Sequence, residues 1–462
     1  MTEPNPSIFD DLYRISENLC ILREDRLALR HPGEHPDTLA AGLLAAPSSA
    51  EEAAAIVRWC LANGVAVVPQ GGRTGLVGGS ASRVGELILS SERLTAISSI
   101  DPLSRTAVVG SGVTLQALQD AARAFGLAPG IDLASRGSAT IGGMVSTNAG
   151  GILAFRNGVM RHQVLGLEAV LPDGSVFSDL TEVVKTSAGP DMKQLLIGAE
   201  GAFGFVTRVA LKLDPIRPHR ATALVGLDGA KAALDLVARL EARAAIRLEG
   251  AELMWRRFFA DSAATHGFDA SWNDADTAAV LLVEISAESI EVAEADLEHV
   301  LEEAWEPTGI RGGIVARSLD QARRFWDLRE ASDFIYRLHP DAPSFDVSLP
   351  PRALDTYVAA MRERLAALGF DAYVYGHVAD GNLHLSVIGD GANAPELRQQ
   401  IEDAIYRGIA EAGGSFSAEH GVGQEKRAAY LAFGNAGRRA LAQAVKQALD
   451  PKGLFNPGKV PF

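Results

Sequence analysis

The chain has 462 residues and a formal net charge of −15, with 58 acidic against 43 basic side chains. This length predicts two or three domains, and the charge argues against a nucleic acid or an anionic membrane surface as partner. Cys20 and Cys60 are its only cysteines, which favours a reducing compartment. The acidic segment from Met1 to Asp11 does not resemble a signal peptide, and no apolar run approaches the roughly 20 residues of a membrane span. We therefore expect a cytoplasmic protein.

The first half of the chain is rich in glycine and in short β-branched runs. This mixture predicts an α+β domain whose loops carry function. Ser49 and Glu52 form a capping-box pattern, and Asn63-Gly64 is a typical helix end. In chain order we expect a helix at 50–63, strands at 65–68 and 106–109, a helix from 115 that stops at Gly126, a hairpin of 164–171 with 175–178, and a strand at 205–213.

The segment from Asp214 to Pro218 contains two prolines and is the expected domain boundary. Beyond it, short apolar runs alternate with long charged helical patterns. This alternation predicts an antiparallel sheet covered by helices. The expected strands are 222–227, 279–285, 345–349 and two hairpin strands near 373–388, and the expected helices are 230–244, 289–304, 319–338, 351–368, 394–412 and 436–449.

The first half of the chain contains three glycine-rich loops. The first, Pro69 to Ser80, directly follows a predicted strand and has five glycines in nine residues. Backbone N–H groups in such a loop can approach a phosphate closely, and Arg73 and Thr74 add side-chain donors. The loop has neither the GxGxxG pattern nor the lysine ending of a P-loop. From composition alone it is either a phosphate cradle or a flexible loop.

The second loop runs from Pro129 to Gly151 and the third from Gly198 to Gly204. Small and hydroxylated residues dominate the second loop, so it buries little apolar area of its own. Ordering it is costly unless it lines something large and flat. Three such loops in one domain imply an extended ligand that contains a pyrophosphate.

His377 and His384 flank the dipeptide Asp380-Gly381 at equal distances. Asp-Gly between apolar runs predicts a two-residue hairpin turn, which places the two histidines directly opposite each other, roughly 5 Å apart on one face. Such a pair can bind one divalent cation, and Glu419 would complete three ligands with one position open. Zinc, manganese and iron all suit this set. The plainer alternative is two histidines on the polar face of an ordinary hairpin.

Seen together, these segments resemble the vanillyl-alcohol oxidase and p-cresol methylhydroxylase superfamily of flavoproteins. Within it, the chain resembles the FAD-linked D-2-hydroxy-acid dehydrogenases, which include D-2-hydroxyglutarate and D-lactate dehydrogenases and the glycolate oxidase D subunit. The resemblance spans residues from about 40 to 460. It is carried by the three glycine loops, Phe325 to Glu330, Gly376 to Leu385, Ser417 to Gly423 and Asn456 to Lys459.

The resemblance implies an FAD-binding domain at 1–217, a substrate or cap domain with the hairpin at 218–417, and a C-terminal segment at 418–462 that returns to the FAD domain. FAD is expected to bind non-covalently, because Arg73 stands where some relatives carry a flavin-linking histidine. The implied FAD-binding residues are Pro69, Gly71, Gly72, Arg73, Thr74, Gly75, Leu76, Gly78, Gly79, Ser80, Pro129, Gly130, Ile131, Ser138, Thr140, Ile141, Gly142, Gly143, Asn148, Gly150, Glu200, Gly204, Val206 and Asn456.

The same resemblance implies roles at the reaction centre. His377, His384 and Glu419 would bind a divalent metal, commonly zinc. His420 would be the catalytic base, and Arg329 would be the second catalytic residue. Arg329, Asn382 and His420 would bind the substrate. A positioned base near neutral pKa and a bidentate arginine suit the oxidation of a 2-hydroxy acid by hydride transfer to flavin.

Expected partners are a small anionic 2-hydroxy acid and an electron acceptor such as another flavoprotein or a quinone. We expect no nucleic acid and no membrane span, and a homodimer is compatible with the sequence. Three alternatives stay open: an oxidase that uses dioxygen, a metal hydrolase and a non-catalytic flavin-binding protein. The substrate is also open, because Ser344 and Asp333 depart from the pattern of relatives that act on 2-hydroxyglutarate.

Overall fold

The computed structural model describes residues 12–16, 18–273, 276–330 and 332–461, and the prediction made for Met1 to Asp11 lies outside them. The chain divides into two compact units. The first contains residues 1–151, 156–216 and 419–462, and the second contains residues 152–155 and 217–418. Among the described residues, no helix has the length and apolar character needed to cross a membrane.

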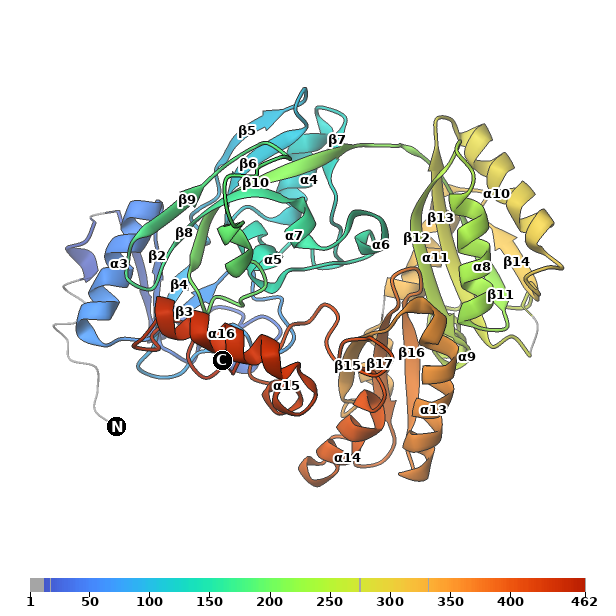
Figure 1. Ribbon diagram of the computed structural model, residues 1–462. Coiled ribbons are helices and arrows are strands. Elements are labelled where there is room, and N and C mark those ends of the chain that lie inside the picture. The colour runs from blue at the N-terminus through green and yellow to red at the C-terminus, as the bar shows by residue number, and fades with distance from the viewer. Residues whose placement is uncertain (1–11, 17, 274–275, 331, 462) are drawn as a thin grey trace. The chain divides into compact units, whose positions relative to one another are not determined.

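The first unit begins with a four-stranded sheet of order β1-β2-β4-β3 (Figure 1). Helix α3 (Ala50–Asn63) connects two of its strands. The Ser49 hydroxyl accepts a hydrogen bond from the Glu52 amide, and Gly64 ends the helix with φ +67°, so the predicted N-cap and helix end are confirmed. The second bond of the predicted capping box differs, because the Glu52 carboxylate accepts the Ser48 amide. The elements are β1 (Cys20–Arg23), α2 (Glu24–Leu27), η1 (Pro36–Leu39), β2 (Leu43–Ala46), β3 (Val67–Gln70) and β4 (Leu87–Ser90).

A second, antiparallel sheet in this unit has the order β5-β6-β10-β8-β9, with β7 paired to β10. The predicted hairpin at Pro172-Asp173-Gly174 is confirmed as β8 and β9. The elements are β5 (Ile97–Asp101), β6 (Thr106–Gly110), α4 (Leu115–Arg123), β7 (Leu127–Pro129), α5 (Ile141–Thr147), α6 (Ala154–Asn157), α7 (Met160–Gln163), β8 (Val164–Val170), β9 (Val176–Asp179), η2 (Met192–Leu195) and β10 (Phe205–Pro215).

The C-terminal segment is built into the first unit. The Val67 amide donates to the Leu454 carbonyl, and the Asn456 amide donates to the Val67 carbonyl, so the tail extends the edge at β3. Lys446, in helix α16 (Ala436–Leu449), donates to the carbonyls of Ala202 and Phe455. The tail therefore supports both the first sheet and the third glycine loop. Helix α15 (Arg427–Phe433) precedes it.

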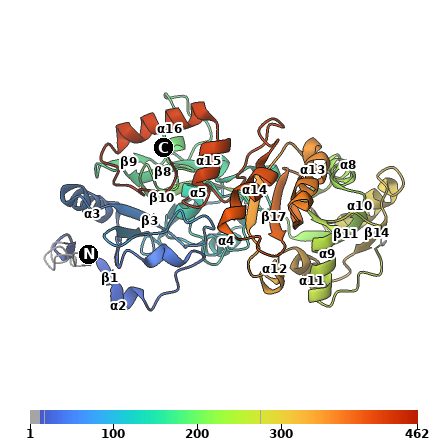
Figure 2. The ribbon, with the colours of Figure 1, turned by 90° about the horizontal axis from the view of Figure 1, so that it is seen from below.

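The second unit is a seven-stranded sheet of order β14-β11-β13-β12-β16-β17-β15 in which every neighbouring pair is antiparallel. Helices α8, α10 and α13 cover one face, and α9 and α11 cover the other (Figure 2). The strands are β11 (His219–Leu227), β12 (Arg247–Trp255), β13 (Ala279–Ala287), β14 (Gly312–Val315), β15 (Ser344–Ser348), β16 (Asp371–His377) and β17 (Asn382–Ile388).

The helices of the second unit are α8 (Ala230–Glu241), α9 (Arg256–Thr265), α10 (Ile290–Ala304), α11 (Leu319–Glu330), α12 (Phe334–Leu338), η3 (Pro351–Ala353), α13 (Leu354–Ala367) and α14 (Pro395–Tyr406). The predicted α+β class and helix-covered antiparallel sheet are confirmed. Several details were wrong. The single helix expected at 319–338 consists of the separate helices α11 and α12, and the helix expected at 394–412 ends at Tyr406. The predictions also omitted β12, β14 and α9.

Candidate active site

The β16–β17 hairpin has a different register from the one predicted. His377 pairs with Asn382, and Tyr375 pairs with His384, so the turn has four residues rather than two. A two-residue turn of the predicted type needs positive φ at both central residues, and Asp380 does not have it. Instead, the Gly381 amide donates to the His377 carbonyl. Gly381 itself has φ +79°, and a Cβ there would lie 1.8 Å from the Leu349 carbonyl oxygen.

The two histidines nevertheless lie together on one face of the sheet. The register is shifted by two residues, and side chains alternate with a period of two, so the shift preserves the face. His377 and His384 are diagonal neighbours whose ring centroids are 5.4 Å apart and nearly perpendicular. The second unit therefore brings together, by itself, two of the three predicted metal ligands.

A buried carboxylate, which sequence reasoning missed, lies against His377. Glu252 on β12 is directly opposite His377 in the β12–β16 pair and has no exposed surface. One of its oxygens, Oε1, lies 2.6 Å from Nδ1 of His377. Burial by itself raises the pKa of Glu252, but the opposing charges of His377 and Arg329 bring that pKa down to about 2. The carboxylate is therefore ionised at neutral pH.

Arg329 lies in the last turn of α11, where a cation is favoured by the helix dipole. Its Nε atom is 2.7 Å from the second oxygen of Glu252, and the two groups form an ion pair without the alignment of a hydrogen bond. The guanidinium also covers the ring of Tyr375, with Cζ 4.8 Å from the ring centroid. Glu252 and Tyr375 thus hold this buried arginine from two sides.

Helix α11 is positioned on the sheet one turn before Arg329. The Trp326 indole donates to Glu284 at 3.0 Å. Gly250 on β12 makes room for this ring, because a Cβ at that position would lie 2.8 Å from it. The spacing Trp-x-x-Arg therefore combines an anchor and a functional side chain on the same face of one helix.

Asp346 on β15 is a second buried carboxylate on the face of the hairpin histidines. It is paired with His384 in the β15–β17 register. Its two oxygens accept hydrogen bonds from the Asn382 side-chain amide and from the backbone amide of Ala418, each at 3.0 Å. Within the described residues, the buried Oδ1 atom of Asn382 has no hydrogen-bond partner. That acceptor suits a donor on a bound ligand.

Glu419 and His420 begin the third segment of the first unit, directly after Ala418. The Glu419 carboxylate accepts a hydrogen bond from the Gly151 amide of the second glycine loop. The grouping of Glu419 with the hairpin histidines stays a prediction, because those histidines belong to the second unit.

The segment after His420 is fixed by Glu200 of the third glycine loop. The two carboxylate oxygens of Glu200 accept the amides of Val422 and Gly423, each at 2.7 Å. Burial raises the pKa of Glu200. Asn456 closes the cluster, because its side-chain amide donates to the carbonyls of Gly79 and Glu200. Glu200 and the Asn456 side-chain amide nitrogen thus support the loops through hydrogen bonds to backbone groups.

The three glycine loops contact one another in the first unit. A Cβ at Gly72 would lie 1.9 Å from the Ser138 carbonyl oxygen, and a Cβ at Gly71 would lie 2.2 Å from the Thr140 hydroxyl. The Glu200 amide donates to the Ser146 carbonyl at 2.8 Å. The first and second loops therefore approach more closely than any side chain would allow.

The backbone amides of the first loop are the strongest structural sign of a phosphate site. In the part of the chain that the structure describes, none of the amides from Gly71 to Ser80 donates a hydrogen bond to another protein group. The Nε atom of Arg73 is also buried without a partner there. Unpaired donors at a glycine-lined surface fit a pyrophosphate, so these residues are compatible with FAD.

Several predicted FAD-binding residues have side chains in the hydrophobic core beneath the loops. Ile131, Ile141 and Val206 are at most 4% exposed and belong to one apolar cluster. Any contact of these three residues with a flavin would therefore come from their backbone. By contrast, Leu76 is 54% exposed in the first loop.

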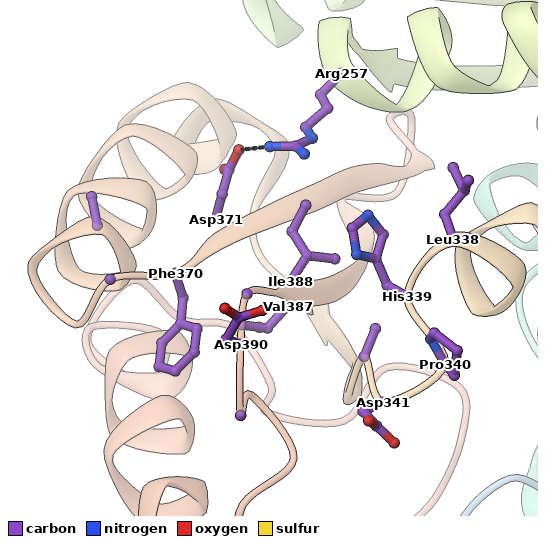
Figure 3. Close-up of a pocket in the computed structure, with 15 residues that line it drawn as sticks. Arg257, Leu338, His339, Pro340, Asp341, Phe370, Asp371, Val387, Ile388 and Asp390 are labelled. Carbon is purple, nitrogen blue, oxygen red and sulfur yellow. Dashed lines mark hydrogen bonds and ion pairs between the residues drawn. The ribbon is translucent and has the colours of Figure 1, made fainter.

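A separate pocket of about 690 Å³ lies at the other end of the hairpin (Figure 3). Asp371, at the start of β16, and Ile388, at the end of β17, line it, and Arg257 donates to Asp371 at 2.6 Å. His377 lies six residues further along β16 than Asp371, which corresponds to roughly 20 Å. The pocket is therefore distinct from the histidine pair.

The two residues that depart from the 2-hydroxyglutarate pattern have local partners. The Ser344 hydroxyl is 2.6 Å from the Tyr336 hydroxyl. Asp333 is exposed, with its carboxylate 3.5 Å from Nε of Arg337. The charge of Asp333 is thus partly compensated within α12.

Glu252 and Asp346 are the site residues that the sequence predictions lacked. Each is an isolated acidic residue in an otherwise apolar run, Ala251 to Trp255 and Phe345 to Val347. A carboxylate in such a run needs a buried partner. This requirement is the sequence feature that could have identified both residues as parts of a site.

Comparison with known proteins agrees with an FAD-binding first unit and an oxidase-type second unit. Residues 41–179 match the model of an FAD binding domain, and residues 216–460 match the model of the C-terminal domain of FAD linked oxidases. A D-2-hydroxyglutarate dehydrogenase of Xanthomonas citri pv. viticola is 36% identical over 428 residues, covering 90% of this chain and 88% of that protein. The mitochondrial D-2-hydroxyglutarate dehydrogenase of Rattus norvegicus is 33% identical over 419 residues, covering 90% of this chain and 77% of that protein.

Solved structures show the same fold at low identity. p-Cresol methylhydroxylase with substrate bound superposes with a TM-score of 0.73 at 17% identity, covering 98% of this chain and 97% of that one. For 4-ethylphenol oxidase from Gulosibacter chungangensis the TM-score is 0.72 at 18% identity, with the same coverage. The fold and the glycine-loop site define an FAD-dependent oxidoreductase. Within that class, the chain belongs to the family of FAD-linked D-2-hydroxy-acid dehydrogenases.

We predict that Gly72→Ala loses most of the bound FAD, because the added methyl group forces the first and second loops apart. The measurement is flavin absorbance per mole of purified protein. Gly137→Ala is the matched control, since no atom lies within 4 Å of a Cβ at that position of the second loop. Wild-type flavin content in Gly72→Ala would contradict the role of this close approach in FAD binding.

Proposed function

We propose that this protein oxidises a D-2-hydroxy acid to the 2-oxo acid, with FAD and a divalent metal as cofactors and His420 as the base. The observation that carries the proposal is the polar face of the second unit, on which buried Arg329 lies beside the His377–His384 pair. An arginine that can bind a carboxylate and a pair of imidazoles that can bind a metal match the two ends of a 2-hydroxy acid.

The donor set fits the metal. His377 and His384 supply two imidazoles on one sheet face, and Glu419 is proposed as the carboxylate ligand that completes three. Asp346 holds Ala418 in the second unit, and Glu200 holds Val422 in the first. Covalent geometry therefore confines the three residues between these anchors to a span of at most about 15 Å. Two of those residues are Glu419 and His420.

Each protein group has a defined task in the proposed reaction. Arg329 binds the substrate carboxylate, and Asn382 contributes its buried Oδ1 atom, which is unpaired among the described residues, to the substrate site. His420 accepts the proton of the 2-hydroxyl group while the hydride leaves the α-carbon. Bound FAD supplies the hydride acceptor, and a bound metal supplies positive charge that lowers the pKa of the hydroxyl group. The products are the 2-oxo acid, the reduced flavin and one proton on His420.

The names of the relatives favour D-2-hydroxyglutarate as the first substrate to test. A panel of D- and L-2-hydroxy acids, mixed anaerobically with the purified protein, should bleach the flavin absorbance for at least one D-acid and for no L-acid. Flavin that no D-2-hydroxy acid reduces would overturn the proposal. Reoxidation of the flavin by dioxygen, compared with reoxidation by an artificial acceptor, separates a dehydrogenase from an oxidase.

The free thiols of Cys20 and Cys60 support our further proposal of a reducing, cytoplasmic location.

We predict that His420→Ala retains FAD and metal but reduces the flavin roughly 10²- to 10⁴-fold more slowly, which is the usual contribution of a general base. Stopped-flow measurement of anaerobic flavin reduction tests this, with metal content determined on the same samples. A rate close to that of the wild type would exclude His420 as the base.

Loss of the metal should follow from removal of one hairpin histidine. We predict that His384→Ala retains FAD but loses both the bound metal and turnover, as measured by elemental analysis and steady-state assay. His299→Ala is the control, because this half-exposed histidine on α10 pairs with Glu303. If His384→Ala binds as much metal as His299→Ala does, the histidine pair is not the metal site.

A further inference from the structure

Glu252 contacts two residues that the proposed function treats separately. Its Oε1 atom lies 2.6 Å from Nδ1 of His377, and its Oε2 atom lies 2.7 Å from Nε of Arg329. We propose that Glu252 is a positioning residue that fixes the metal-binding nitrogen of His377 and the carboxylate-binding guanidinium of Arg329 in one geometry. This inference rests on the proposed function, because it assigns a task to a residue behind that site.

The contact with His377 selects a tautomer. An ionised carboxylate accepts hydrogen bonds and cannot donate them, so Nδ1 of His377 must carry the proton. The lone pair is then on Nε2, which makes Nε2 the metal-binding atom. A carboxylate behind a metal-binding histidine also raises the basicity of the ring and limits its rotation. The register supports this arrangement, because β12 places Glu252 directly opposite His377.

The contact with Arg329 compensates the charge of a buried guanidinium. Arg329 is 8% exposed, and an unpaired guanidinium at that depth would be strongly destabilising. Glu252 supplies the counter-charge at Nε, which is one edge of the planar group. Within the described residues, the two terminal amino groups of Arg329 donate no hydrogen bond to the protein, so they can bind a substrate carboxylate in the bidentate manner.

One carboxylate therefore sets the separation between the two ends of the substrate site. Arg329 comes from a helix and His377 from a strand, and Glu252 is the group that contacts both. Tyr375 strengthens the arrangement, because its ring lies under the guanidinium at 4.8 Å and beside the His384 ring at 5.3 Å. A change at Glu252 should thus weaken metal binding and substrate binding together.

The test is the variant Glu252→Gln, which preserves size and removes the charge. Metal affinity, measured by chelator competition, should fall roughly 10- to 100-fold, as expected for loss of a carboxylate behind a metal-binding histidine. The KM for the 2-hydroxy acid should rise by a larger factor than kcat falls, because Arg329 loses its fixed orientation. Flavin content and the unfolding midpoint are measured on the same samples.

The control is Glu168→Gln in the first unit, where a buried carboxylate pairs with Arg208 at 2.6 Å. It should lose stability but keep wild-type metal affinity and KM. Equal metal affinity and KM in the wild type and Glu252→Gln would overturn the inference. So would an equal loss of metal affinity in both variants, because that result indicates general destabilisation. Failure of the proposed metal site itself would be distinguishable from this outcome. In that case the His384→Ala variant would bind as much metal as the wild type does.

If Glu252→Gln does not fold, a paired comparison replaces it. Removing both buried charges leaves no unpaired ion in the core. The double variant Glu252→Gln with Arg329→Gln should bind the metal roughly 10-fold or more weakly than Arg329→Gln alone, because only the double variant lacks the carboxylate behind His377. Equal affinities in these two variants would overturn the inference.

Discussion

A carboxylate without exposed surface is stable inside a protein only where opposite charges or N–H donors surround it. Glu252 meets this requirement with His377 on one side and Arg329 on the other, which brings its pKa down to about 2. Other elements of the second unit bring these two partners to Glu252. Strand β12 lies beside β16, Arg329 lies in the last turn of α11, and Gly250 leaves room for the Trp326 anchor. Glu252 thus links Arg329 with His377 on the polar face that we propose to bind substrate.

Carboxylates also organise the segment that contains Glu419 and His420. In the second unit, Asp346 binds the Ala418 amide and the Asn382 side chain. In the first unit, Glu200 binds the amides of Val422 and Gly423. Glu419 and His420 therefore directly follow a residue fixed in the second unit and shortly precede two residues fixed in the first.

The sequence predicted local features well and tertiary ones less well. The caps of α3 depend on Ser49 and Gly64 alone, so they could be recognised without a structure. The shared face of His377 and His384 was correct, because any even shift of register preserves it, but the turn itself depends on a contact between Gly381 and Leu349. Strand β12 was missed because Glu249 and Glu252 interrupt its apolar pattern. The burial of Glu252 depends on His377 and Arg329, which come from other elements and which no local pattern contains.

The most direct test of the central claim is anomalous X-ray scattering from crystals of the holoenzyme, recorded at the absorption edge of its bound metal. The account predicts one peak, about 2.0–2.1 Å from Nε2 of His377 and from a ring nitrogen of His384, as for zinc on imidazole. Nδ1 of His377 should face Glu252 in the same map. A peak on Nδ1 of His377, or a metal bound away from the histidine pair, would contradict the account.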